Sequence, residues 1–259
     1  MIDTHCHLDH SRFDDDRDQV LSRAIAAGVA VQVIPAINRA GWPAICSLCS
    51  DRPALYPAYG LHPMFLSSHR DSDIEKLDSW LQSEPAVAVG ECGLDLFIDN
   101  PDMPRQEKLF TMQLELAASH RLPVIIHARK SVEEVIGILR RYPQVGGVLH
   151  SYSGSQQQAR RLIDMGFILG FGGPVTHPRA RRLHKLVAEL PLEALLLESD
   201  APDQPDAAHR GERNEPAYLG NVLETIARLR GISGDHLAAA TSDNAQRLFG
   251  IPPVIRQPQ

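Results

Sequence analysis

A chain of 259 residues, 43% of them hydrophobic and 22% charged, can bury a large core, which excludes a disordered segment and a small disulfide scaffold. Its formal net charge of -6 excludes a protein that coats duplex nucleic acid by charge alone, so any nucleic-acid contact must be local. The amino terminus carries no secretion signal, no apolar run approaches about 18 residues, and the four cysteines are best explained as reduced thiols. We therefore expect a cytoplasmic protein without a membrane partner.

Short runs of β-type residues recur about every 32 residues along the chain. They are apolar at nearly every position, which is typical of parallel strands that are covered on both faces. The predicted strands are Ile2–Thr4, Val29–Ala36, Leu55–Gly60, Ala86–Gly90, Pro123–Ile126, Gly147–Leu149, Phe167–Gly170 and Leu195–Ser199.

Amphipathic segments with helix signals separate these runs. Capping-box patterns begin at Ser72, Ser131 and Ser155, and Gly28 and Gly166 stand where the residue after a helix end is expected. The segment from Arg105 to His120 carries one apolar stripe, which we interpret as core: Leu109, Met112, Leu116 and Ala117.

Eight strands that alternate with helices over about 250 residues predict an α/β fold, a (β/α)8 TIM barrel in one domain. We place the barrel at residues 1–251, with an extra C-terminal helix from Ser233 to Phe249 on the outside and a loose tail over residues 252–259. A doubly wound open sheet is the alternative. It would need a glycine-rich first turn, and the turn after the first strand is Cys6-His7-Leu8-Asp9.

Six residues with nitrogen or oxygen donors lie at the carboxyl ends of five predicted strands, which open on one face of a barrel. Four imidazoles and two carboxylates suit Zn²⁺, Mn²⁺ or, with water, Mg²⁺. Six donors are too many for one catalytic tetrahedral ion and suit two divalent metal ions, with Glu91 as the bridging carboxylate. The candidate metal ligands are His5, His7, Glu91, His127, His150 and Asp200.

The four cysteines and five of the other histidines are interpreted as structural or surface residues. Cys6 and Cys92 flank ligands and should point away from the cavity, and Cys46 and Cys49 lie within a helical segment, where core thiols are favoured over a redox pair. Five other histidines fall in loops or helices, and we interpret them as surface residues: His69, His120, His184, His209 and His236.

Eight stretches in order carry a further pattern: Ile2–Asp9 (IDTHCHLD), Gly60–Pro63 (GLHP), Gly90–Asp95 (GECGLD), Pro123–Arg129 (PVIIHAR), His150–Gly154 (HSYSG), Leu197–Pro202 (LESDAP), Arg213–Pro216 (RNEP) and Asn244–Phe249 (NAQRLF). Together they resemble the TatD-type metal-dependent deoxyribonucleases of the amidohydrolase superfamily over nearly the whole chain. The resemblance implies that His5, His7, Glu91 and Asp200 hold one ion, that Glu91, His127 and His150 hold the other, and that DNA ends are the substrate. Ser199 and Cys92 depart from the family pattern without removing a ligand.

The function hypothesis is a divalent-metal-dependent hydrolase, a phosphodiesterase or deoxyribonuclease of exonuclease type that uses a water activated by two metals. Asp200 and Glu91 are the candidate catalytic residues, with Asp200 as the base. Glu198 either supports Asp200 from the next layer or is a buried carboxylate paired with a nearby His or Arg. Two alternatives stay open: a metal-dependent amide or ester hydrolase of a small metabolite, and a non-catalytic metal-holding or DNA-binding module.

The candidate substrate-binding residues are His62 at the mouth, Arg129 and Ser153, the last because the start of a helix there can offer backbone N–H groups to phosphate. Because aromatic residues make up only 5% of the chain, we expect no stacking platform for long single strands, and hence an enzyme that trims DNA or short nucleic-acid ends. Oligomeric state is left open. A basic rim is predicted from Arg129, Lys130, Arg179, Arg181, Arg182, Arg210 and Arg213.

Overall fold

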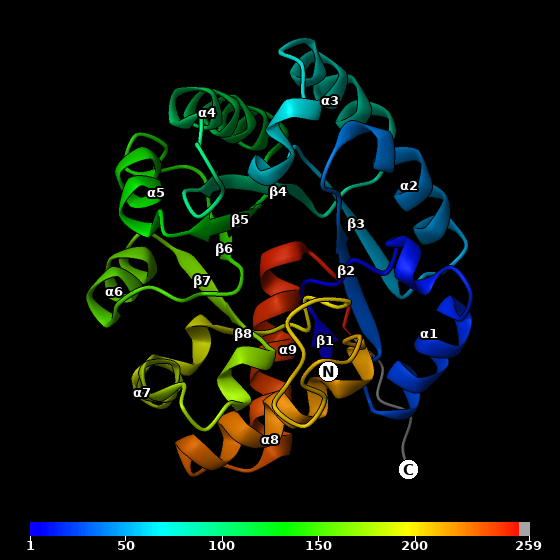
Figure 1. Cartoon of the computed structure of the whole chain (residues 1–259), viewed down its shortest axis with the longest axis vertical. Coiled ribbons are helices and arrows are strands. Elements are labelled where there is room, and N and C mark those ends of the chain that lie inside the picture. Colours follow the sequence, from blue (N-terminus) through cyan, green and yellow to red (C-terminus); the bar gives the residue numbers. More distant parts are fainter. Residues whose placement is uncertain (254–259) are drawn as a thin grey trace.

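The computed structural model describes residues 1–253 and confirms the predicted (β/α)8 barrel. Eight parallel strands form one sheet in the order β1 to β8, with helices around it (Figure 1). The strands are β1 (Ile2–Asp3), β2 (Val31–Pro35), β3 (Leu55–Tyr59), β4 (Ala88–Asp95), β5 (Val124–Arg129), β6 (Gly147–Leu149), β7 (Phe167–Phe171) and β8 (Leu195–Leu197).

The helices begin and end partly where the sequence signals predict. Gly28 and Gly166, with φ of 81° and 87°, follow the ends of α1 and α6, and Ser155 forms a complete capping box at the start of α6. The boxes predicted at Ser72 and Ser131 are wrong, since neither side chain caps its helix. The helices are α1 (Arg17–Ala26), α2 (Trp42–Ser50), α3 (Ser72–Ser83), α4 (Met103–His120), α5 (Val132–Leu139), α6 (Gln156–Asp164), α7 (Arg181–Glu189), α8 (Leu219–Arg230) and α9 (Gly234–Phe249).

Backbone hydrogen bonds between the first and last strands close the ring. Thr4 N donates to Leu197 O at 3.1 Å, and Asp200 N donates to His5 O at 2.8 Å. The buried Asp3 carboxylate reinforces the seam, because its Oδ1 accepts the backbone N–H groups of both His5 and Ser199. The residues that follow β1 and β8 are therefore held next to each other.

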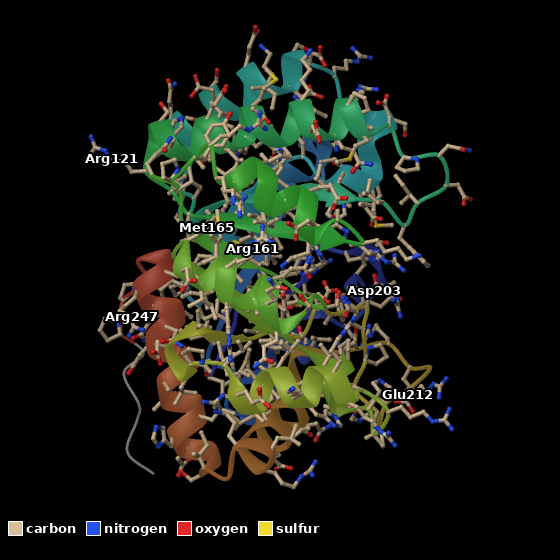
Figure 2. The ribbon with its side chains drawn as sticks, turned by 90° about the vertical axis from the view of Figure 1, so that its left-hand side faces the viewer. Arg121, Arg161, Met165, Asp203, Glu212 and Arg247 are labelled. Atoms are coloured by element: carbon tan, nitrogen blue, oxygen red, sulfur yellow. The ribbon has the colours of Figure 1, made fainter. Side chains whose placement is uncertain are left out.

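Helix α9 closes the amino end of the barrel. Its Ala245 and Phe249 pack, with Ile251, against the apolar side chains inside the ring, among them Val33 and Ile125. Figure 2 shows the consequence from the side: α9, marked by Arg247, lies at one end of the barrel, and the loop after β8, marked by Asp203 and Glu212, lies at the other. The helix is outside the ring of strands, as predicted, but it forms a floor under the interior and does not join the outer layer of helices.

Strand β4 extends five residues beyond the predicted end at Gly90, and β5 extends beyond Ile126 to Arg129. Both extensions contain polar residues that face the carboxyl end of the barrel, so a search for apolar runs stops too early. The pairing register between β4 and β5 shifts between Val89 and Cys92, and Glu91 lies in this irregularity. Glu91 is therefore inside a strand and not at its end.

The core stripe predicted on α4 is only partly right. Leu109 and Ala117 are buried, but Met112 and Leu116 are half-buried, because the buried face is centred one position away. Two glutamines occupy that face: Gln106 bonds to N and O of Asp95, and Gln113 bonds to N and O of Leu61. These amides fix the backbone of two segments that lead into the cavity.

Among residues 1–253, no helix is long and apolar enough to cross a membrane. The four cysteine thiols are free. Cys6 and Cys92 are buried among the residues between strands and helices, and Cys49 is buried while Cys46 is half-buried, as expected for core thiols. The predicted loose tail lies mostly outside the described residues.

Candidate metal centre

All six predicted donor residues meet at the carboxyl end of the barrel. They come from the segments after β1, β6 and β8 and from within β4 and β5. All of them except the fully buried His5 line a cavity of about 760 Å³, a size typical of ligand pockets. The donors are His5, His7, Glu91, His127, His150 and Asp200.

The first group of donor atoms consists of His5 Nε2, His7 Nε2, Glu91 Oε2 and Asp200 Oδ1. The two imidazole nitrogens are 3.2 Å apart. His5 Nε2 lies 3.1 Å from Glu91 Oε2 and 3.5 Å from Asp200 Oδ1, and His7 Nε2 lies 3.6 Å from each of these oxygens. Four lone-pair donors therefore converge on one point.

The second group lies on the other oxygen of the same carboxylate. Glu91 Oε1 is 3.0 Å from His127 Nδ1 and 2.8 Å from His150 Nε2, and these two nitrogens are 3.3 Å apart. Each oxygen of Glu91 thus faces a different set of donors. This is the arrangement that a carboxylate bridging two ions requires.

The spacing of the first group fits a bound ion. Ligand atoms about 2.0–2.2 Å from a tetrahedral Zn²⁺ lie about 3.3–3.6 Å from one another, and the measured separations are 3.1–3.6 Å. The donor set, imidazole and carboxylate without thiolate, also suits Mn²⁺ or Mg²⁺. The first donor group therefore has the spacing and the chemistry to hold a divalent ion.

The electrostatics of the centre also favour cations. Burial opposes ionisation of Glu91, but His150 and His62 outweigh burial and hold its pKa well below the usual range. Burial likewise opposes a charge on His150, yet the Glu91 carboxylate raises the pKa of that imidazole to about 10. Burial, and then the charge of His150, lowers the pKa of His5 to about 4. The ionised Glu91 carboxylate therefore stabilises a positive charge next to it.

Asp95 orients one of the donors. Its Oδ2 lies 2.9 Å from His127 Nε2, and its Oδ1 accepts the backbone N–H of Phe97 at 2.8 Å. An ionised carboxylate can only accept, so His127 donates its Nε2–H to Asp95, which leaves Nδ1, facing Glu91, as the atom that would bind an ion. Asp95 was not singled out from the sequence, although it stands four residues after Glu91 on the same strand.

Glu198 is fully buried behind the candidate metal ligands, which is compatible with both interpretations from the sequence. Its Oε1 accepts the backbone N–H of Ser151 and lies 3.8 Å from His150 Nδ1, and burial raises its pKa to about 8. A Cβ on Gly170 would lie 2.1 Å from Glu198 Oε2, so only glycine fits beside it. Glu198, His5 and His150 also offer ligand atoms within 4.8 Å of one another. Glu198 therefore lies behind His150, and its raised pKa favours the protonated, uncharged carboxyl group at neutral pH.

His62 is buried beside the second group and not at the open mouth. Its Nε2 lies 2.9 Å from Glu91 Oε1, and its Nδ1 accepts the backbone N–H of Met64 at 3.0 Å. Because Nδ1 is the acceptor and burial lowers the pKa of His62 to about 4, the proton of the neutral ring is on Nε2. His62 thus acts as a hydrogen-bond donor to the centre. The surface interpretation of His69 is wrong, since this buried ring bonds to the His62 carbonyl through Nε2.

Gln204 holds the outer oxygen of Asp200. The Gln204 amide nitrogen donates to Asp200 Oδ2 at 2.5 Å, and its amide oxygen accepts from Ser151 Oγ at 2.9 Å. Asp200 itself has a φ of 55°, in the left-handed region that is sparsely occupied without glycine. The amide therefore fixes which oxygen of Asp200 faces the histidines. No pattern in the sequence indicated Gln204.

The predicted substrate-binding residues His62, Arg129 and Ser153 all line the cavity. The Arg129 guanidinium lies 3.9 Å from the centre of the exposed Phe97 ring. At the start of α6, however, the capping box already occupies the backbone N–H groups of Ser155 and Gln158, which leaves less for a phosphate than predicted.

The predicted basic rim is smaller than the sequence suggested. Arg213 is engaged in two bonds to Asp16 and one to Glu215, all at 2.7 Å, and it stacks on Phe13, so it is a structural residue. Other rim arginines are exposed and do not line the cavity: Arg179, Arg181, Arg182 and Arg210.

A TIM barrel with imidazole and carboxylate donors gathered at the carboxyl ends of its strands defines the class of metal-dependent barrel hydrolases. The family model described as TatD related DNase matches residues 2–250. The chain therefore belongs to the TatD family of metal-dependent hydrolases, as the sequence motifs predicted.

Named relatives span almost the same length. The chain is 41% identical over 256 residues to the uncharacterized metal-dependent hydrolase YjjV of Escherichia coli K12, covering 97% of this chain and 98% of that one. It is 34% identical over 260 residues to the protein named 3'-5' ssDNA/RNA exonuclease TatD of Klebsiella pneumoniae, covering 97% and 98%. The crystal structure of the Escherichia coli YjjV protein superimposes with a TM-score of 0.94 at 40% identity, over 97% and 98% of the two chains.

Proposed function

We propose that this protein hydrolyses phosphodiester bonds at the ends of DNA or short nucleic acids, and that it uses two divalent ions, Zn²⁺, Mn²⁺ or Mg²⁺. The observation that carries the proposal is that the two oxygens of Glu91 face separate donor groups at ligand-like distances. His5, His7, Glu91 and Asp200 would hold one ion, and Glu91, His127 and His150 the other. When bound, the ions would supply Lewis acidity and a more acidic water.

The side chains around this centre have separate tasks in the proposal. Asp200 belongs to the first donor group and lines the cavity, so we assign it to accept the proton of the attacking water. The Nε2–H of His62 points at Glu91 Oε1 and can donate to a phosphoryl oxygen that approaches there. Arg129 on the cavity wall would bind a phosphate of the same strand.

A nucleic-acid substrate is favoured over a small amide or ester by two observations. The relative from Klebsiella pneumoniae carries the name of a 3'-5' exonuclease for single-stranded DNA and RNA. The cavity wall combines a cation, Arg129, with donors such as Ser153, and a phosphodiester can use both. A structural metal site would be closed, whereas these donors line an open cavity, which argues against a non-catalytic role.

The test is a substrate screen on protein reconstituted with Zn²⁺, Mn²⁺ or Mg²⁺ after chelation. We expect single-stranded DNA to be shortened from an end, no turnover with chelator, and no turnover for Glu91→Gln at an unchanged unfolding temperature. Asp102→Asn, at an exposed helix cap, is the matched control. Hydrolysis of esters or amides with none of oligonucleotides would overturn the proposal in favour of a metabolite hydrolase.

A further inference from the structure

Most of the large exposed hydrophobic side chains lie at or beside the cavity. Among residues 1–253, the large hydrophobic side chains that are exposed are Ile25, Met64, Phe65 and Phe97, at 63%, 45%, 38% and 49%. Three of these four belong to the catalytic face: Met64 and Phe65 line the cavity, and Phe97 packs under Arg129. Exposed apolar side chains that gather at the opening of one cavity indicate a ligand that covers them.

Met64 and Phe65, which we name the rim shelf, are fixed close to the metal centre. They lie in the short helical segment η3 (Pro63–Ser68), directly after His62. The Phe65 ring lies 5.7 Å from the His62 ring, which in turn lies 4.5 Å from the His127 ring. A row of three rings therefore leads from the second donor group to the rim, and a group bound at the centre continues outward over Phe65.

Two cationic side chains lie near the same opening of the cavity. The Arg129 guanidinium and the Lys130 ammonium lie 3.9 Å and 4.4 Å from the centre of the Phe97 ring, which holds both cations in place. The mouth thus offers an apolar shelf for a flat, uncharged group and cations for a phosphate. A nucleotide contains both a flat base and a phosphate.

From this juxtaposition we propose that the rim shelf is a stacking site for one unpaired nucleobase next to the scissile phosphate. The proposal rests on the phosphodiesterase function and adds the part of the substrate that is recognised. Bases inside a duplex have both faces covered, whereas an unpaired end can swing a single base away from its strand onto Phe65. The low aromatic content predicted no platform for long strands, but one ring at this position suffices for a single base.

The test compares a short single-stranded oligodeoxynucleotide with a series in which one residue at a time is abasic. With wild-type protein and Mn²⁺, loss of one particular base should raise KM about 10-fold, and a blunt duplex should be a poorer substrate than the single strand. Phe65→Ala should raise KM for the complete strand by a similar factor, and for this variant the same abasic residue should make no further difference. Phe65→Trp should restore the low KM, and Ile25→Ala, a change at an exposed hydrophobic residue outside the cavity, should alter nothing.

The outcomes separate the two proposals. If Phe65→Ala and the abasic residue raise KM independently, so that their effects multiply, Phe65 acts through His62 and the stacking site is refuted while the nuclease stands. The same conclusion follows if no abasic position affects KM. If wild-type protein shortens no oligonucleotide with any of the three metals, the phosphodiesterase function itself fails, and the stacking site with it.

Discussion

The bond between Asp95 and His127 makes a sharp prediction, because Asp95 must accept two hydrogen bonds at once. Its two oxygens accept from Phe97 N and from His127 Nε2 at 2.8 and 2.9 Å. Asparagine has one acceptor oxygen, so Asp95→Asn loses one of the two bonds in either amide orientation. If the amide NH₂ faces the ring, the proton of His127 moves to Nδ1, the atom beside Glu91 that would otherwise bind the ion.

We expect Asp95→Asn to weaken the metal site of His127 and His150 by about 10- to 100-fold, or about 1.4–2.7 kcal/mol at 25 °C. The site of His5 and His7 should keep its affinity, because neither ring contacts Asp95. Calorimetric titration of the chelated protein with Zn²⁺ or Mn²⁺ resolves the two sites, and Asp102→Asn provides the control for the same chemical change. Equal weakening of both sites, or none, would refute this account of how His127 is oriented.

Three further perturbations test other contacts. Gln204→Leu should lower kcat about 10-fold with little change in KM, since Asp200 loses the donor to its outer oxygen; an unchanged kcat would remove Gln204 from the site. Phe249→Ala should lower the free energy of unfolding in urea by about 3–5 kcal/mol, because this buried ring closes the amino end of the barrel; a loss below about 1 kcal/mol would contradict that role. The hydrogen bond from Arg213 lowers the pKa of Asp16 to about 2, so this pair adds stability above about pH 4 that is lost as the pH falls toward 2. Arg213→Ala should therefore lose less stability over that interval than wild type, as measured by unfolding temperature against pH.

The barrel and the donor residues could be predicted from sequence because both follow from local rules. Apolar runs of strand length mark the strands, and parallel strands of a barrel all point their carboxyl ends to one face. His5 and Asp200, almost two hundred residues apart, could therefore be assigned to the same place before any contact was known. Strand ends were less certain: β4 continues through Glu91 to Asp95 because its polar half faces the cavity.

The residues that orient the donors could not be found in this way. Gln204, His69 and Asp95 are ordinary polar residues, and each acquires its role only from the path of the backbone, which brings Gln204 to Asp200, Asp95 to His127 and His69 to the His62 carbonyl. The same holds for Arg213, whose charge suggested phosphate binding until Asp16 and Glu215 were seen to surround it. The sequence gives the charge and type of each residue, but it does not show which other residue that side chain contacts in the folded chain.

The two donor groups are held in different ways, which bears on how the centre responds to change. His127 is fixed from behind by a carboxylate, whereas His5 Nδ1 has no hydrogen-bond partner among the described residues, and its ring is held by stacking on His150 at 4.0 Å. Because His150 belongs to the second group and His5 to the first, this stack couples the orientations of the two groups. Glu91 couples them again through its two oxygens. A substitution that tilts His150 should therefore disturb both groups, while one that acts on His127 through Asp95 should disturb only the second.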